Sequence, residues 1–335
     1  MQEKDQRAAM NRLIGAYRQS CCVGVAAELQ IPERLAAGAR TSADLATECG
    51  ANELSLRRLL RALVAMEVLM ETPSEHFGLT PLGEQLRADK LGPAARLFNS
   101  EFHVRSWAHM DHSVKTGDIA FDHLYGMDDW NFYATHPEEG ALFDAAMSAN
   151  TGPVITAIAD AYDFSRFSRL ADIGGGDGTL LAEILRRHPQ NRGLLFDLPH
   201  VVERAKVRLR DMGVADRIQF VGGSFLESLP SGADAYLMKS IIHDWDDSHS
   251  AKIIERCRNA AVVGAHLLLI ERVMPEQVEP RHLEGLLMDL NMMVSNGGLE
   301  RTEREFRTLM QRGGFRLERV VPTETVFCVL ESVAI

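Results

Sequence analysis

A glycine-rich turn that joins an apolar segment to a helix constrains the fold of this chain more than any other feature. The stretch LADIGGGDGTL spans residues 170–180, and the next apolar segment, LLFDLP, places Asp197 about twenty positions after the glycines. Gly174 and Gly176 allow a tight turn and a close approach of the backbone to a ligand. An acidic residue at the tip of the following strand can accept hydrogen bonds from ribose hydroxyls. Glycines are common in plain loops, but this order of elements predicts a pocket for a nucleotide-type cofactor.

The spacing of the glycines separates two cofactors that both carry a ribose, a nicotinamide dinucleotide and S-adenosylmethionine. Gly174, Gly176 and Gly178 follow a GxGxG pattern, and the third glycine of the dinucleotide pattern GxGxxG would fall on Thr179. The dinucleotide pattern therefore fails by one position, and no pyrophosphate has to be held here. This spacing disfavours a nicotinamide-dependent oxidoreductase, which we keep as an alternative hypothesis.

The periodicity of apolar residues changes along the chain. After residue 163, short apolar segments alternate with amphipathic ones, which predicts a mostly parallel sheet covered on both faces, an α/β doubly wound fold. In the first part of the chain, apolar residues instead recur every three or four positions, as in helices. We predict a helical winged-helix-like domain over 1–95, a helical connector over 96–163 that contributes to a substrate pocket, and a cofactor-binding catalytic domain over 164–335.

Part of the first region resembles a winged helix-turn-helix. A helix is predicted to start at Thr41, Gly50 makes the turn, a second helix covers 53–66, and a short hairpin follows. Such units commonly bind DNA. The chain carries a net charge of -11, however, and nucleic-acid affinity comes largely from basic side chains. We therefore interpret this region as a dimerisation platform, with a ligand-sensing DNA-binding regulator as the alternative.

Cysteine usage and the start of the chain address the metal content and the compartment. The five cysteines show no spacing typical of metal ligands, so we predict no metal site. Their odd number indicates reduced side chains, and the start MQEKDQRAAM lacks the apolar run of a signal peptide. We expect a cytoplasmic protein with neither a nucleic-acid nor a membrane partner.

One histidine is set apart from the others by its position. The segment MKSIIHDWDD, residues 238–247, is predicted to lie at the carboxyl end of the fourth strand of the sheet. Ligands of doubly wound sheets bind beyond the carboxyl ends of the strands, so His243 is predicted at the mouth of the site. A structural role is the alternative, but a histidine beside Asp244 and Asp246 at this place is a candidate general base.

Together these segments resemble a known family, the S-adenosylmethionine-dependent small-molecule O-methyltransferases of bacteria and plants, of the caffeic-acid type with an N-terminal dimerisation domain. The resemblance covers nearly the whole chain. It rests, in order, on LADIGGGDG, LLFDLPHVV, GGSFLES, IIHDWDD, LLLIERVMP and GGLERTEREFRTLMQRGGF. It implies a Rossmann-like methyltransferase sheet, S-adenosyl-L-methionine as cofactor, a homodimer and a role in secondary metabolite biosynthesis.

The resemblance also implies roles for individual residues. His243 would be the base, and Glu271 and Glu300 would flank it. The predicted cofactor-binding residues are Gly174, Gly176, Asp197, Gly223, Ser224, Phe225, Lys239 and Ser240. Family members usually carry an acidic residue where Ser224 stands, so the hydrogen bond to the adenine edge is expected to be weaker or to be made differently.

The implied reaction moves the methyl group of S-adenosylmethionine to a phenolic hydroxyl of a small aromatic metabolite. A sulfonium methyl is already a strong electrophile, so the protein must chiefly supply a deprotonated nucleophile in line with it. A carboxylate beside the imidazole would hold its neutral tautomer and stabilise the imidazolium as it forms. For Glu300, a helix-capping role is the alternative. N-methylation of an aromatic heterocycle is a further alternative, because some amines need no base.

Candidate acceptor contacts come from two helical segments. We predict Phe143 and Met147 in the first, and Asn291 and Met292 in the second. Methionine at helical spacing is more often part of the core, so this assignment has a plain structural alternative. Flat aromatic acceptors do suit walls of this composition.

Overall fold

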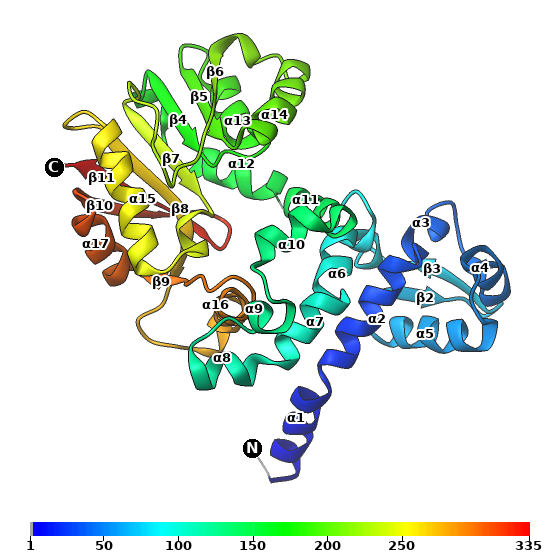
Figure 1. Cartoon of the computed structure of the whole chain (residues 1–335). Coiled ribbons are helices and arrows are strands. Elements are labelled where there is room, and N and C mark those ends of the chain that lie inside the picture. The colour runs from blue at the N-terminus through cyan, green and yellow to red at the C-terminus, as the bar shows by residue number, and fades with distance from the viewer. Residues whose placement is uncertain (1–2, 150) are drawn as a thin grey trace. The chain divides into compact units, whose positions relative to one another are not determined.

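The computed structural model describes residues 3–149 and 151–335 and divides the chain into two compact units (Figure 1). The first unit comprises Met1–Ala108 and Met127–Thr151, and the second comprises His109–Gly126 and Gly152–Ile335. The predicted connector, 96–163, thus contributes segments to both units. Among the described residues, no helix is long and apolar enough to cross a membrane.

The first unit is helical with one small sheet. Its helices are α1 (Glu3–Gly15), α2 (Tyr17–Glu28), α3 (Ile31–Leu35), α4 (Ser42–Cys49), α5 (Glu53–Ala65), α6 (Gly92–Phe98), α7 (Glu101–Ala108), α10 (Asp129–Thr135) and α11 (Pro137–Ala149), with a 3-10 turn at Gly83–Leu86. The sheet has the order β1-β3-β2, formed by β1 (Arg40–Thr41), β2 (Leu69–Glu71) and β3 (His76–Leu79).

Local capping explains why the winged-helix pattern folds as predicted. The hydroxyl of Thr41 accepts the Asp44 N–H at the start of α4, and the Asn52 side chain accepts the Ser55 N–H at the start of α5. Gly50 ends α4 with φ of 65°, a left-handed conformation that favours glycine. The helix, turn, helix and hairpin predicted from residue 41 onward are therefore all present.

The second unit is built on one large sheet of order β10-β11-β8-β7-β4-β5-β6, with the short β9 paired to β8. Its strands are β4 (Arg169–Ile173), β5 (Arg192–Asp197), β6 (Ile218–Gly222), β7 (Ala235–Lys239), β8 (His266–Met274), β9 (Arg301–Thr302), β10 (Phe315–Pro322) and β11 (Phe327–Ala334). The pairs from β6 to β8 are parallel, and β11 and β10 add two antiparallel strands at one edge.

Helices cover both faces of this sheet (Figure 1). They are α12 (Thr151–Ala161), α13 (Thr179–Arg187) and α14 (Pro199–Asp211) on one face, and α15 (Asp247–Ala260) and α17 (Glu303–Arg312) on the other. Successive residues of a strand point to opposite faces, so Leu268 joins the first core and Leu269 the second. Both side chains are fully buried, which is why the strands read as continuous apolar runs. The predicted doubly wound α/β fold is confirmed.

The order of the strands places the site. The chain leaves β4 toward β5 on one side and returns to β7 on the other, so the strand order reverses at β4. In such sheets the crevice at the carboxyl ends of the strands on either side of the reversal is where ligands bind. The remaining helices of this unit, α8 (Met110–Thr116), α9 (Ala120–Tyr125) and α16 (Leu283–Ser295), pack against one another.

A buried carboxylate ties together the antiparallel edge of the sheet. Glu331 of β11 is 3 % exposed and forms ion pairs with Arg166 (2.9 Å) and Arg319 (2.7 Å), and its carboxylate lies 3.0 Å from the His266 ring. Burial alone would raise the pKa of Glu331, but hydrogen bonds and charge from Arg319, Tyr162 and Arg166 hold it below its usual value. Its contribution to stability is therefore present at neutral pH and lost as the pH falls through the lowered pKa.

We predict that Glu331→Gln lowers the free energy of unfolding by about 1–3 kcal/mol at pH 7, because both arginines lose a charged partner that is buried. The matched control is Glu303→Gln in the half-exposed pair with Arg307, which should change stability by less than about 0.5 kcal/mol. Urea unfolding of each variant measures the difference, and the effect of Glu331→Gln should shrink in acid. Equal effects of the two substitutions would contradict the prediction.

Candidate functional site

The glycine turn after β4 has the backbone that its sequence predicts. Gly174, Gly176 and Gly178 have φ of 65°, 57° and 77°, in the left-handed region that favours glycine. A Cβ atom on Gly174 would lie 2.5 Å from Cδ1 of Ile241, so this position also lacks room for a side chain. Around Gly176 nothing in the described structure lies within 4 Å of a Cβ position. The backbone of the turn is thus open to a ligand at Gly176.

Asp197 meets this turn from the end of β5. Its Oδ2 accepts the Gly176 N–H at 2.8 Å and its Oδ1 accepts the Leu198 N–H at 2.7 Å. The Gly174 N–H donates to the carbonyl of Phe196 at 2.8 Å. The two predicted parts of the cofactor pocket are therefore in direct contact, and the carboxylate keeps lone pairs for further donors such as ribose hydroxyls.

Asp172 of β4 lies beneath the turn and was missed by sequence reasoning. Its side chain is buried, and a Cβ atom on Gly175 would lie 2.9 Å from its Oδ2. Burial, followed by the charge of Asp197, raises the pKa of Asp172 to about 7, while Lys239 opposes the shift. Its Oδ2 accepts no hydrogen bond from any described residue. The sequence signal that could have identified Asp172 is an acidic residue inside an otherwise apolar strand.

The loop after β6 brings Gly223, Ser224 and Phe225 toward the same place. The Gly223 N–H donates to the carbonyl of Asp197 at 2.9 Å. The Ser224 hydroxyl accepts the Leu226 N–H at 3.2 Å, which shapes its own turn. The Phe225 ring comes within 3.7 Å of a Cβ position on Gly174. Phe225 is thus beside the glycine turn, as a residue that stacks on adenine would have to be.

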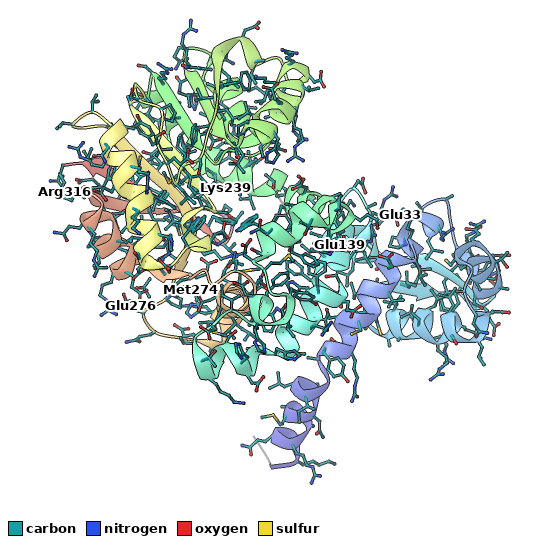
Figure 2. The ribbon with its side chains drawn as sticks, viewed as in Figure 1. Glu33, Glu139, Lys239, Met274, Glu276 and Arg316 are labelled. Atoms are coloured by element: carbon teal, nitrogen blue, oxygen red, sulfur yellow. The ribbon has the colours of Figure 1, made fainter. Side chains whose placement is uncertain are left out.

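Lys239 is the last residue of β7 (Figure 2). Ser240 follows it directly in the chain. Burial lowers the pKa of Lys239, although Glu271 and Asp172 oppose the change. The Lys239 ammonium lies 5.4 Å from the centre of the Phe327 ring. Ser240 has φ of 53°, a left-handed conformation uncommon for a residue with a side chain. This local bend turns the chain out of the strand and into the turn that carries His243.

His243 lies in a short 3-10 turn, Ile242–Asp244, and its side chain is 13 % exposed. Its Nδ1 is 3.1 Å from Oε1 of Glu300, and its Nε2 is 3.4 Å from Oδ1 of Asp244. A Nδ1–H that donates to Glu300 leaves Nε2 as the basic nitrogen of the neutral ring. The predicted histidine and one of its predicted carboxylate partners are therefore in contact.

The two predicted carboxylates hold different parts of this turn. Glu271 of β8 is fully buried, and its Oε1 accepts the N–H groups of Ile241 (3.0 Å) and Ile242 (2.9 Å). Glu271 thus fixes the backbone next to His243, while Glu300 contacts the ring.

The helix-capping alternative for Glu300 does not fit the structure. The N-cap of α17 is Thr302, which forms a capping box with Glu305. The side chain of Glu300 is instead buried, and Arg272 approaches its Oε1 at 3.6 Å.

The carboxylates around His243 change its acidity. Burial acts to lower the pKa of His243, but the charges of Glu271, Asp244 and Glu300 overcome it and raise the pKa to about 9. Burial likewise raises the pKa of Glu271 to about 7. Both His243 and Glu271 therefore have raised pKa values, and the imidazole is a stronger base than that of a free histidine.

The predicted acceptor contacts lie on two helices in different units. Asn291 and Met292 are 8 % and 9 % exposed on α16 in the second unit. Phe143 and Met147 are on α11 in the first unit, where the Phe143 ring stacks on Tyr133 with ring centres 4.6 Å apart. Asn291 and Met292 thus lie in the unit that contains His243. The role of all four residues stays a prediction. In the part of the chain that the structure describes, no cluster of side chains could hold a metal ion.

Comparison with known proteins gives two family models and many relatives. A model described as an O-methyltransferase domain matches residues 107–316, and one described as an O-methyltransferase dimerisation domain matches residues 11–89. The chain is 40% identical to phenazine O-methyltransferase PhzM of Lysobacter antibioticus over 324 residues, which cover 96% of this chain and 94% of that protein. It is 33% identical to 8-amino-8-demethylriboflavin N,N-dimethyltransferase of Streptomyces davaonensis, over 98% of this chain and 96% of that one.

A solved structure adds a complex with ligands. The O-methyltransferase NcsB1 from neocarzinostatin biosynthesis, in complex with S-adenosylmethionine and 2-hydroxy-5-methyl naphthoic acid, superimposes with a TM-score of 0.81. The two chains are 34% identical, and the match covers 95% of this chain and 96% of that chain. The likeness therefore extends over both units of the fold.

We predict that the His243 ring titrates with a pKa of about 9 in the protein without ligand, and that Glu300→Gln lowers this value because the ring loses a charged partner. Long-range ¹H–¹⁵N NMR of labelled histidine, recorded across pH 5 to 10, measures both. A His243 signal that titrates below pH 6.5 in the wild-type protein would contradict the assignment.

Proposed function

Because this chain belongs to the S-adenosylmethionine-dependent O-methyltransferase family, we propose that His243 is its general base and that it methylates a phenolic hydroxyl of a small aromatic metabolite. The observation that carries this proposal is the buried contact between His243 Nδ1 and Glu300 Oε1 at the carboxyl end of the sheet. It leaves Nε2 available to remove the proton of an acceptor hydroxyl.

The residues around the glycine turn fit the cofactor. The open backbone at Gly176 admits a ligand, Asp197 has lone pairs for ribose hydroxyls, and Phe225 lies beside the turn for the adenine ring. The hydroxyl of Ser224 accepts a hydrogen bond within its own turn. As a serine, it offers the adenine edge a hydroxyl in place of the usual carboxylate. When bound, S-adenosylmethionine supplies an electrophilic methyl group. The protein then has to bind the acceptor, orient it and take its proton.

The raised basicity of His243 makes that proton transfer accessible. A phenol of pKa about 10 and an ordinary histidine of about 6.5 differ by roughly 5 kcal/mol, at about 1.36 kcal/mol per pKa unit. With the pKa of His243 raised to about 9, most of this difference is removed. The cost is that a raised pKa keeps the ring mostly protonated, and so unable to accept a proton, at neutral pH. Activity should therefore increase with pH until it levels off near 9.

We predict that His243→Asn lowers kcat about 10²- to 10⁴-fold, the usual contribution of general-base catalysis, and leaves the Kd of S-adenosylhomocysteine unchanged. Turnover with a panel of phenols and calorimetric titration measure the two quantities. In the wild type kcat/KM should rise with pH up to about 9, and this rise should be absent in the variant. His249→Asn, in the first turn of α15, is the matched control and should retain activity.

The result also separates the two acceptor classes. A relative of this chain is named as an N,N-dimethyltransferase, so a nitrogen acceptor is the second candidate. An amine that needs no deprotonation would be methylated almost equally well by His243→Asn. Retained turnover with intact cofactor binding would thus remove the general-base role and favour N-methylation.

The proposal includes a homodimer formed through the first unit. This unit matches a dimerisation domain, and Leu13 and Ile14 of α1 are 66 % and 65 % exposed. Between α2 and α5 there is also a cavity of about 370 Å³ with mainly apolar lining. Exposed apolar surface of this kind is typical of an interface.

Arg57 pairs with Glu75 at 2.8 Å, which argues against a DNA-binding surface on α5. The five free cysteines support the proposed cytoplasmic location.

We predict that Leu13→Asp shifts the protein from dimer to monomer, because a charge introduced into the proposed apolar interface would have no partner there. Light scattering after size-exclusion chromatography measures the mass. Asn11→Asp adds the same charge at an exposed polar position of α1 and should leave the dimer intact. A wild-type protein that is monomeric at micromolar concentration would contradict the dimer.

A further inference from the structure

We infer that Arg301 is a positioning residue that fixes the backbone of the His243 turn for catalysis, an inference that rests on the proposed function. Arg301 lies in β9 directly after Glu300, and its side chain is fully buried. It does not touch the imidazole. Its guanidinium contacts the main chain on both sides of His243.

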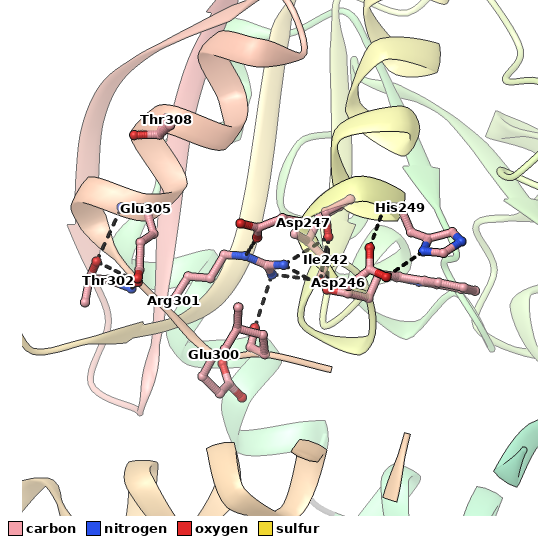
Figure 3. Close-up of polar contacts among 12 residues, drawn as sticks. Ile242, Asp246, Asp247, His249, Glu300, Arg301, Thr302, Glu305 and Thr308 are labelled. Atoms are coloured by element: carbon pink, nitrogen blue, oxygen red, sulfur yellow. Dashed lines mark hydrogen bonds and ion pairs between the residues drawn. The ribbon is translucent and has the colours of Figure 1, made fainter. Parts of the chain in front are cut away.

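All three nitrogens of the guanidinium are used (Figure 3). Nη1 donates to the carbonyl of Ile242 at 3.1 Å, and Nη2 donates to the carbonyl of Trp245 at 2.8 Å. Nε pairs with Asp247 at 2.9 Å. Ser250 accepts from Nη2 at 3.3 Å and lies within hydrogen-bond distance of the same two carbonyls. Ile242 immediately precedes His243 and Trp245 follows two positions later, so the bonds bracket the histidine.

The carboxyl group of Glu271 holds the opposite groups of the same turn. The carboxylate of Glu271 accepts the N–H groups of Ile241 and Ile242, while the guanidinium of Arg301 binds the carbonyl groups. The Leu299 N–H donates to the carbonyl of His243 itself at 2.8 Å. The position of the imidazole is thus set by a main chain whose N–H groups are bound by a buried carboxyl group and whose carbonyl groups are bound by a buried guanidinium.

Arginine is the side chain that this arrangement requires. A guanidinium is planar and has five N–H groups in a fixed fork, so it can reach the two carbonyls, Ser250 and Asp247 together. Lysine carries three donors on one rotating nitrogen and cannot span the same acceptors. Asp247, the one carboxylate paired with Arg301 among the described residues, has a side chain that is 59 % exposed. A buried charge is costly unless it is hydrogen-bonded, and the buried guanidinium here binds the main chain of the His243 turn, which favours a role in positioning.

The register of the chain couples this clamp to the ring. In an extended segment, neighbouring side chains point to opposite sides, so Glu300 reaches the imidazole while Arg301 reaches the turn that carries it. Two adjacent residues therefore set both the orientation of the His243 ring and the position of the main chain that carries it. Loss of Arg301 should displace the ring relative to the acceptor without altering the glycine turn that binds the cofactor.

The test uses the full-length enzyme with the substitutions Arg301→Lys and Arg301→Ala. A milder variant, Ser250→Ala, keeps the guanidinium of Arg301 and removes only one of its acceptors. We expect kcat to fall about 100-fold in the Arg301 variants, the effect of a misplacement of about 1 Å, with the Kd of S-adenosylhomocysteine within about 2-fold of wild type. Added guanidinium ions should raise the kcat of Arg301→Ala at least about ten-fold. Ammonium ions should not raise it, because only guanidinium has the planar arrangement of N–H groups. Arg304→Ala, at an exposed surface pair, is the matched control and should show neither effect.

NMR of His243 makes the outcome independent of turnover. In Arg301→Lys or Ser250→Ala the His243 titration should move from about 9 toward 6.5, because the ring leaves Glu300. A folded variant with unchanged His243 titration and near-wild-type kcat would overturn the inference, as would a loss of kcat matched by a loss of cofactor binding. If the wild-type enzyme methylates no phenol while the titration still moves, the proposed function fails and the positioning role of Arg301 stands.

Discussion

The contact between the His243 ring and the buried carboxylate of Glu300 is the interaction on which the chemistry that we propose for this protein depends. It forms because β8 and β9 pair in parallel and because the turn after β7 lies against them. The charges of Glu271 and Asp244, together with this contact, raise the pKa of the ring to about 9. A ring with this pKa is a stronger base than a free histidine, and it binds its proton more tightly. An active site that depends on one such contact needs a rigid frame around it.

The frame is made of buried charges more than of apolar packing. Asp172, Glu271, Glu300 and Arg301 are all less than 5 % exposed, and they lie around the carboxyl ends of β4 and β7. Buried charges are costly unless they are paired and hydrogen-bonded, so each displacement of one member leaves another unsatisfied. This cost makes the geometry specific. Elsewhere in the second unit the cores on the two faces of the sheet are almost wholly apolar.

Much of this architecture could be predicted from the sequence because it follows from local patterns. The spacing of the glycines predicts the turn, and the acidic residue at the end of the next apolar segment predicts the contact with Asp197. The alternation of short apolar segments with amphipathic ones predicts a sheet covered on both faces. The capping residues Thr41 and Asn52 act within three positions of their partners. His243 could be singled out because the end of a parallel strand has a fixed place relative to the site.

The remainder could not be predicted because it depends on partners that are distant in sequence. Arg301 reads as one more charge after Glu300, and only the fold brings it to Ile242. Glu271 was expected beside the imidazole, and its hydrogen bonds to the backbone of the turn are visible only in three dimensions. The pairing of Glu331 with Arg166 likewise joins segments at opposite ends of the second unit's sequence. No periodicity marks such contacts, since each involves a single side chain.

The interleaving of the two units has a consequence for biosynthesis. The segment His109–Gly126 belongs to the second unit, yet its helices α8 and α9 pack on α16, which begins at Leu283. During translation, Ala120 and Phe121 emerge long before the helix that buries them, and both are almost completely shielded in the finished protein. The nascent chain therefore lacks the partner helix of these two side chains for more than a hundred residues of elongation, and the core around α16 can form only late in synthesis.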